Sequence, residues 1–224
     1  MKLLFEEKKW VDENLMALLN YYNEFEKASI FFKPHMNNFY YNQKIDHCKI
    51  KELLNSIGLE KFEVEIVFTE DLSYLANYGV VEENDFDSNF EINETKITVF
   101  IPKSRVFFKD VIDFEILLNI CSAKLDIDGM EYRTGIDDGA FRLLNLIALG
   151  FSSQLLTCSN REFRVYENDF IRGFNLDLNV TNDLLVYGYL IHFHFFKRDF
   201  TQEENLFSDK IRDLILDYKR ELGW

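Results

Sequence analysis

Two histidines, His192 and His194, stand one residue apart in the uncharged stretch LLVYGYLIHFHFF, residues 184–196. On a strand, an H-x-H pair places both rings on one face, which is a common way to hold a metal ion. On a helix, the same spacing turns the rings about 200° apart, so they cannot share an ion. The stretch is longer than a typical strand of about 4 to 8 residues, which favours a helix. We therefore predict histidines that pack in or beside a core and bind no metal.

A second group that could bind a metal consists of five carboxylates within thirteen residues: Asp126, Asp128, Glu131, Asp137 and Asp138. Hard oxygen ligands of this kind could hold magnesium or calcium, but their spacing is not that of an EF-hand. Turn and helix-cap chemistry accounts for most of these acids. The chain also contains no G-x-S-x-G, GxGxxG or GxxxxGK[ST] motif, so no catalytic residue and no cofactor is predicted.

Acidic residues recur every four positions near the end of the chain, at Asp209, Asp213, Asp217 and Glu221. Side chains four apart are neighbours on a helix, so these acids form a row, flanked by Lys210, Arg212, Lys219 and Arg220. The row is either a solvated helix face or a docking face for a basic partner. The segment 82–94 carries six acids and no base, predicts an exposed loop, and adds Glu82, Glu83, Asp85 and Asp87 to the candidate partner-binding residues.

The charge of the whole chain restricts its partners. It has 25 basic and 39 acidic residues, a net charge of −14. Nucleic acids and anionic membrane surfaces are recognised through lysine and arginine, so neither is an expected partner. A basic protein would be attracted, although acidity also serves simply to keep a protein in solution.

The cysteine pattern and the composition set the expected compartment and domain organisation. Cys48, Cys121 and Cys158 are widely spaced and form no CxxC pair, which indicates reduced thiols in a cytoplasmic protein. The thirteen uncharged residues are too few to cross a bilayer, which needs about 20. No linker rich in Pro, Gly or Ser interrupts the 224 residues. We therefore predict one domain, residues 1–224.

Two helices near 182–198 and 202–222 are expected to form a C-terminal antiparallel hairpin, because the connection between them is short. Thr181 or Asn182 can cap the first helix. Thr201 and Glu204 match a capping box at the start of the second. Apolar residues on one face of the second helix are Phe207, Ile211, Leu214, Ile215, Tyr218 and Leu222.

The remaining elements complete an α+β fold that is predominantly helical. Strands near 62–68 and 95–101 are expected to pair in a small sheet. Helices are expected at 6–28, 46–57, 70–77, 104–121, 137–149 and 159–173. A short strand is predicted near 176–180, and a tight turn at Asp128-Gly129 between short alternating segments.

From these patterns, the expected function is that of a non-catalytic, acidic cytoplasmic binding protein. An inhibitor, an immunity-type protein or an assembly component would engage a protein partner in this way through its acidic surface. The alternative is a metal-dependent enzyme, for example a hydrolase, that uses the 126–138 carboxylates or His192 and His194.

Overall fold

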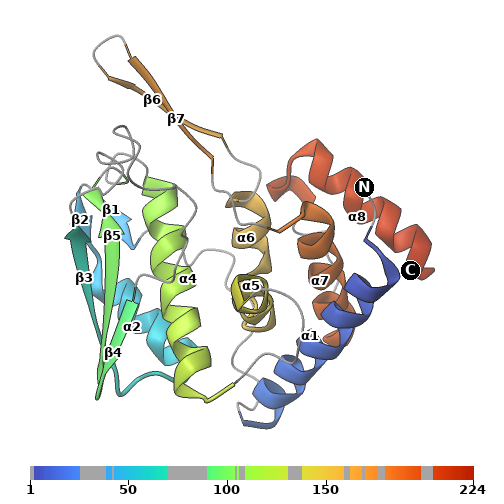
Figure 1. Ribbon diagram of the computed structural model, residues 1–224, viewed down its shortest axis with the longest axis horizontal. Helices are drawn as coiled ribbons and strands as arrows, with labels where there is room; N and C mark the ends of the chain where they lie inside the picture. The colour runs from blue at the N-terminus through green and yellow to red at the C-terminus, as the bar shows by residue number, and fades with distance from the viewer. Residues whose placement is uncertain are drawn as a thin grey trace. The chain divides into compact units, whose positions relative to one another are not determined.

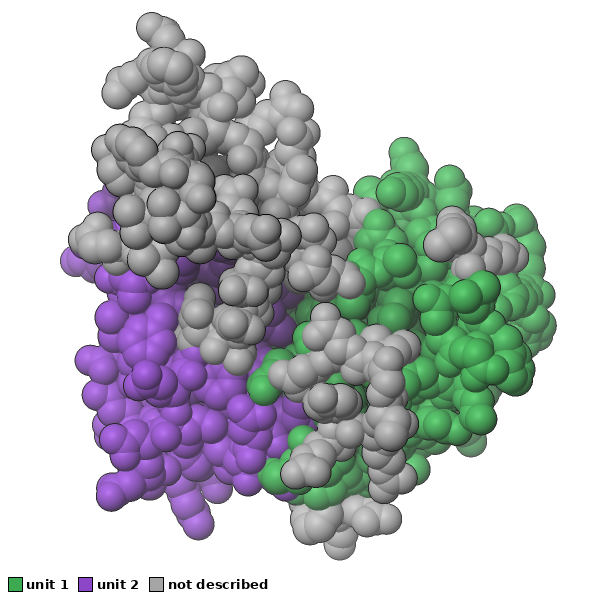
Figure 2. All heavy atoms as spheres, viewed as in Figure 1, with its two compact units in different colours: residues 1–35, 129–162, 174–224 green, residues 36–128, 163–173 purple. Residues whose placement is uncertain are grey.

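The computed structural model shows an α+β protein that is mostly helical, with a small mixed sheet, as the sequence predicts (Figure 1). The described residues are 3–25, 39–41, 43–69, 90–103, 105, 109–130, 138–158, 162–167, 170–175, 180–197 and 204–224. The chain divides into two compact units (Figure 2): residues 1–35, 129–162 and 174–224 form unit 1, and residues 36–128 and 163–173 form unit 2. The single domain expected from the sequence stays a prediction.

Unit 1 consists of helices gathered around α7. Its elements are α1 (Phe5–Phe25), α5 (Asp138–Ala148), α6 (Ser152–Cys158), α7 (Asn182–Phe195), the 3-10 turn η3 (Glu204–Leu206) and α8 (Asp209–Leu222). Helices α1, α5, α6 and α8 all contact α7. The predicted helices at 6–28 and 137–149 are confirmed within the described residues, whereas α6 is an element that the sequence patterns did not indicate.

Helix α7 begins and packs as its sequence predicts. Thr181 is the N-cap, and its hydroxyl accepts a hydrogen bond from the Leu184 amide at 3.3 Å. Almost the whole helix is buried, including Leu190, which is 2% exposed. A Cβ atom at Gly188 would lie 3.1 Å from Cδ1 of Ile147 on α5. The glycine therefore lets α5 approach α7 closely, which offsets its low helix propensity.

Helix α8 forms the predicted C-terminal helical hairpin with α7, but it begins later than predicted. Ser208 is its N-cap, and residues 204–206 form the 3-10 turn η3 instead of the first helical turn expected near 202. Thr201 of the predicted capping box lies outside the described residues. Four residues of the predicted apolar face, Phe207, Ile211, Ile215 and Tyr218, are buried, whereas Leu214 and Leu222 are half-buried.

Unit 2 is built on a three-stranded mixed sheet. The strands are β3 (Glu63–Thr69), β4 (Phe90–Asn93) and β5 (Lys96–Pro102), in the order β3-β5-β4. The predicted pair of strands is confirmed, and β3 runs parallel to β5 while β4 runs antiparallel to it. Ile97, Val99 and Ile101 on the inner face of β5 are fully buried. Helix α4 (Lys109–Ile127) contacts β5 and β4.

The other described elements of unit 2 are α2 (His47–Ser56) and a short antiparallel pair, β1 (Tyr40–Tyr41) and β2 (Lys44–Ile45). The predicted helix at 46–57 is confirmed. The Asp46 carboxylate accepts hydrogen bonds from the amides of Cys48 at 3.0 Å and Lys49 at 3.2 Å, which makes it the N-cap. Gly58, with φ of 73°, supplies the left-handed residue just after the helix.

The acidic segment 82–94 was predicted to be an exposed loop, but part of it is a strand. Residues 82–89 lie outside the described residues, but Phe90–Asn93 is strand β4. Phe90 and Ile92 alternate with Glu91 and Asn93, and Phe90 pairs with Val99 of β5. The many acids in this segment led to the prediction of a loop, because the alternation is only four residues long. Cross-strand pairing with β5 stabilises the short strand.

The predicted hairpin at Asp128-Gly129 is wrong in its first arm. Helix α4 continues to Ile127, six residues beyond the expected end at Cys121. Gly129 has φ of 65° and follows the helix as a left-handed residue. The Asp-Gly pair therefore ends a helix instead of turning a hairpin. The second arm lies outside the described residues.

The predicted helix at 159–173 is also wrong. Residues 162–167 and 170–175 form strands β6 (Glu162–Glu167) and β7 (Phe170–Asn175), which pair with each other. The sequence EFRVYE alternates charged and apolar residues from Glu162 to Val165 and is rich in β-formers. Ser159 and Glu162 also match the S-x-x-E capping box that begins many helices, and that match led to the wrong prediction. The predicted helix at 70–77 and residue 104, the first of the predicted helix at 104–121, lie outside the described residues. Of the predicted strand at 176–180, only Val180 is described, and it lies in no strand. None of the described helices is long and apolar enough to span a bilayer.

Candidate functional site: the acidic rim of helix α8

The predicted row of acids follows the exposed side of α8. The Asp209 side chain is 91% exposed, that of Asp217 is 51% exposed, and Asp213 is also exposed. The Glu221 side chain is 35% exposed. The structure therefore brings the four residues together on one helix, as the spacing predicts. The other candidates, Glu82, Glu83, Asp85 and Asp87, lie outside the described residues.

Basic neighbours contact most of this row. Arg212 pairs with Asp209, and Arg220 lies 3.2 Å from Asp217. Both pairs join exposed side chains three residues apart, and such pairs contribute only about 0.3–0.5 kcal/mol. An incoming cation can therefore replace either arginine at small cost. Asp213 has no ion-pair partner within the part of the chain that the structure describes.

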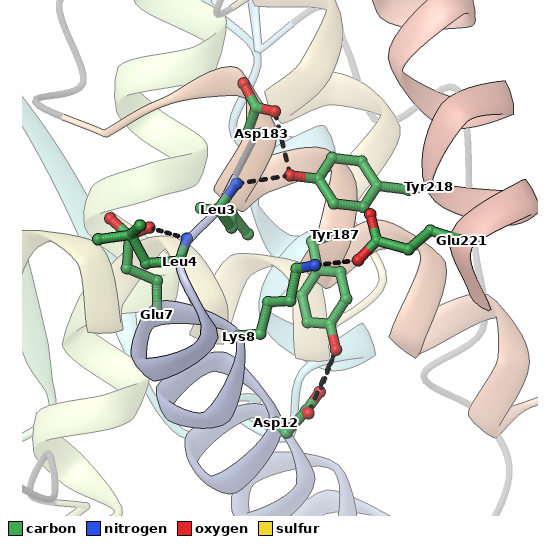
Figure 3. Close-up of polar contacts among 9 residues, drawn as sticks. All are labelled: Leu3, Leu4, Glu7, Lys8, Asp12, Asp183, Tyr187, Tyr218 and Glu221. Atoms are coloured by element: carbon green, nitrogen blue, oxygen red, sulfur yellow. Dashed lines mark hydrogen bonds and ion pairs between the residues drawn. The ribbon is translucent and has the colours of Figure 1, made fainter. Parts of the chain in front are cut away.

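Glu221 is held by a different helix, because its carboxylate pairs with Lys8 of α1 (Figure 3). The Lys8 ammonium also lies 5.6 Å from the centroid of the Tyr218 ring, a cation–π distance. The row thus divides into three acids that face solvent and one that fixes the C-terminal end of α8 to the start of α1.

Tyr218 anchors α8 from its buried side. Its hydroxyl accepts a hydrogen bond from the Leu3 amide at 3.0 Å and donates one to Oδ1 of Asp183 at 3.0 Å (Figure 3). Nearby, the Tyr187 hydroxyl donates to the Asp12 carboxylate at 3.0 Å. These contacts join α1, α7 and α8, so the acidic rim stands on a helix whose position is fixed at several points.

The pKa directions in this network fit a structural role. Burial raises the pKa of Tyr218 to about 12, and it also raises the pKa of Tyr187. Both hydroxyls therefore keep their protons and act as hydrogen-bond donors at neutral pH. Burial raises the pKa of Asp12 as well, although the hydrogen bond from Tyr187 opposes that shift.

Replacing Tyr218 by phenylalanine tests this anchor. The variant keeps the ring but removes the hydroxyl, so the buried Leu3 amide and Asp183 carboxylate both lose a partner. We expect the free energy of unfolding to fall by about 2 kcal/mol, the usual cost of a buried polar group left unpaired. Urea denaturation measures the change. Tyr41→Phe, at a side chain that is 63% exposed, is the matched control, and equal losses in the two variants would contradict the anchor.

The two histidines occupy different surroundings. His192 is 1% exposed, whereas His194 is exposed and stacks on Trp224 with ring centroids 4.2 Å apart. Helix α7 thus turns the rings to different sides, as predicted.

Three carboxylates of the 126–138 group, those of Asp126, Asp128 and Asp138, belong to described residues. Asp128 is 3.1 Å from the Lys124 ammonium, Asp126 is exposed, and Asp138 begins α5 in the other unit. Glu131 and Asp137 lie outside the described residues. Among the described residues, no three His, Cys, Asp or Glu side chains form a group that could hold a metal ion.

Sequence reasoning missed the network around Tyr218. Periodicity placed Tyr218 on the buried face of its helix, correctly. It carried no sign that Leu3, 215 residues away, donates to the Tyr218 hydroxyl. A buried tyrosine needs a partner for its hydroxyl, and that need was the available signal.

No protein-family model, curated protein or solved structure matches this chain.

Proposed function

We propose that the protein is a non-catalytic binding protein that engages a basic protein partner through its acidic surface, with the α8 rim as a contact site. One observation carries the proposal: Asp209, Asp213 and Asp217 face solvent on a helix that is anchored by its opposite face. A fixed helix favours binding, because its charged side chains are already positioned and little conformational entropy is lost when the partner binds.

Binding ranks above the metal-dependent alternative for a structural reason. Lys124 holds Asp128, and the rings of His192 and His194 lie in different surroundings. Among the described residues, neither group brings together three His, Cys, Asp or Glu side chains that could hold a metal ion. We also propose a cytoplasmic location, because Cys48, Cys121 and Cys158 are widely spaced in the sequence and form no CxxC pair.

The triple variant Asp209→Asn, Asp213→Asn and Asp217→Asn tests the proposed contact. It removes three charges from one face and preserves side-chain size. We expect its melting temperature to stay near that of the native protein, since exposed substitutions usually change stability by less than about 0.5 kcal/mol each. Its association rate with a captured basic partner should fall several-fold, and the difference should shrink as salt rises.

The control variant carries Glu6→Gln, Glu13→Gln and Glu60→Gln, which neutralise three exposed acids elsewhere. Equal losses in both variants would show that only net charge matters. Unchanged association in the aspartate variant would show that the α8 rim is a solvated face. A captured protein counts as a partner only when its binding is then measured with both proteins purified.

A further inference from the structure

The outer face of the three-stranded sheet also carries exposed acids. Helix α4 contacts β5 and β4, and Figure 1 shows α4 and α2 on the same side of the sheet. The register places Glu63 beside Lys96, and Glu65 and Glu91 on either side of Thr98. These residues project from the face opposite to the buried Ile97 and Val99, because side chains alternate along a strand.

This face carries an excess of negative charge. Glu63, Glu65 and Glu91 are all exposed, from two different strands, and Lys96 is the base that the register places among them. Lys96 lies 2.8 Å from Glu65, with both side chains about half exposed at 50% and 52%. Such an exposed pair is readily exchanged for a partner's cation. Glu63 and Glu91 flank it at the two edges of the sheet.

An apolar strip adjoins the acids on the same face. Val67 pairs with Phe100 in the register two residues beyond the Glu65–Thr98 pair, and both side chains are half-buried. Parallel strands are normally covered on both faces, usually by helices. Here β3 and β5 are parallel, yet their outer face keeps an exposed acidic end and a partly exposed apolar end.

We propose that this outer sheet face binds a basic amphipathic helix of a protein partner, a proposal that rests on the proposed function above. The helix places lysine or arginine against Glu63, Glu65 and Glu91, and an apolar side chain against Val67 and Phe100. A helix suits the site because helices are the usual cover of parallel strands. A second copy of the chain does not suit it, because two molecules of net charge −14 repel each other.

The probe is a synthetic helical peptide of leucine and lysine, about 18 residues or five turns long. The reference peptide replaces each lysine by glutamate. Binding to the native protein is measured by fluorescence anisotropy, and the bound region is mapped by hydrogen exchange. We expect the lysine peptide to bind and the glutamate peptide not to bind, with protection centred on β3 and β5.

Three variants locate the contact. Glu65→Gln combined with Glu91→Gln should weaken binding about five-fold, from two exposed charge contacts. Phe100→Thr keeps a strand-forming residue and should weaken binding further through lost apolar contact. The control variant that carries Glu6→Gln, Glu13→Gln and Glu60→Gln, three exposed acids outside both proposed sites, should leave peptide affinity within about two-fold of the native value. Thermal melting confirms that each variant is folded before its affinity is compared.

The outcomes separate the two proposals. Peptide affinity is also measured for the α8 triple asparagine variant. A loss of affinity in that variant, with none in the sheet variants, would overturn the sheet-face site and leave the proposed function standing. No binding by the native protein, or equal binding to the lysine and glutamate peptides, would also overturn the site. Loss of the captured partner with the α8 variant decides the proposed function separately. A loss of peptide affinity in the sheet variants alone, together with protection of β3 and β5 from hydrogen exchange, supports the sheet-face site.

Discussion

Replacing Leu190 by aspartate is expected to unfold the protein. Leu190 is 2% exposed in the middle of α7, the helix that α1, α5, α6 and α8 all contact. A carboxylate there would be buried without a partner, at a cost of several kcal/mol. Natural domains are stable by about 5–15 kcal/mol, so this substitution removes a large share of the total. Far-UV circular dichroism and a thermal melt measure the result.

The control for this experiment is Leu216→Asp on α8. Leu216 is 45% exposed, so its carboxylate would remain hydrated, and we expect a change within about 1 kcal/mol. A Leu190→Asp variant that melts like the native protein would show that α7 is not the buried centre of unit 1. A comparable loss in both variants would mean that added negative charge, not burial, is responsible.

The elements that were predicted correctly carry strong local signals. Helix α2 has a capping aspartate at Asp46 and a stop at Gly58, and α7 combines Thr181 with an uncharged run. Strand β3 alternates acidic and apolar residues from Glu63 to Ile66. In each case the deciding side chains lie within a few residues of the element: they bond to its free backbone amides or define its buried face. A short stretch of sequence is therefore enough to predict the element.

The elements that were missed depend on contacts with residues outside such a short stretch of sequence. Strand β4 is only four residues long and is stabilised by pairing with β5. Residues 159–173 carry a capping-box pattern and an alternating pattern at once, and pairing of β6 with β7 decides between them. Helix α4 is buried on nearly all sides, so it has no polar face whose end would mark the end of the helix.

The candidate sites divide in the same way. Exposure of Asp209, Asp213 and Asp217 follows from helical spacing alone, and it was predicted. The pairing of Glu221 with Lys8 joins opposite ends of the sequence, and no local rule indicates it. On the sheet face, the strand that carries Glu63 was predicted, but its combination with Glu91 required the strand order β3-β5-β4.

The second large effect concerns pH and a buried carboxyl group, Glu115 on α4. Glu115 is 7% exposed, its ion-pair partner is Arg105, and its Oε2 has no hydrogen-bond partner among the described residues. Burial raises the pKa of the Glu115 carboxyl from 4.5 to about 7, although the Arg105 guanidinium opposes the shift. The folded protein therefore holds this proton more tightly than the unfolded chain does.

The sign of the pH dependence follows from that difference. A raised folded-state pKa stabilises the fold fully below pH 4.5, and the stabilisation is lost as pH rises through about 7. The shift corresponds to about 3 kcal/mol. Glu115→Gln removes the titration and keeps an acceptor for Arg105. Compared with this variant, the native protein should lose about 3 kcal/mol of unfolding free energy between pH 4.5 and pH 8.

Urea denaturation of both proteins across this range measures the difference. Each protein is compared with itself at successive pH values, so a constant offset from the altered Arg105 contact cancels. The same substitution at Glu91, which is exposed on the sheet face, controls for the change of residue type. A difference between native protein and Glu115→Gln that stays constant with pH would show that the carboxyl group is hydrated in the folded state. A difference that grows as pH rises, with the variant becoming the more stable of the two, would establish Glu115 as a buried acid that weakens the fold above neutral pH.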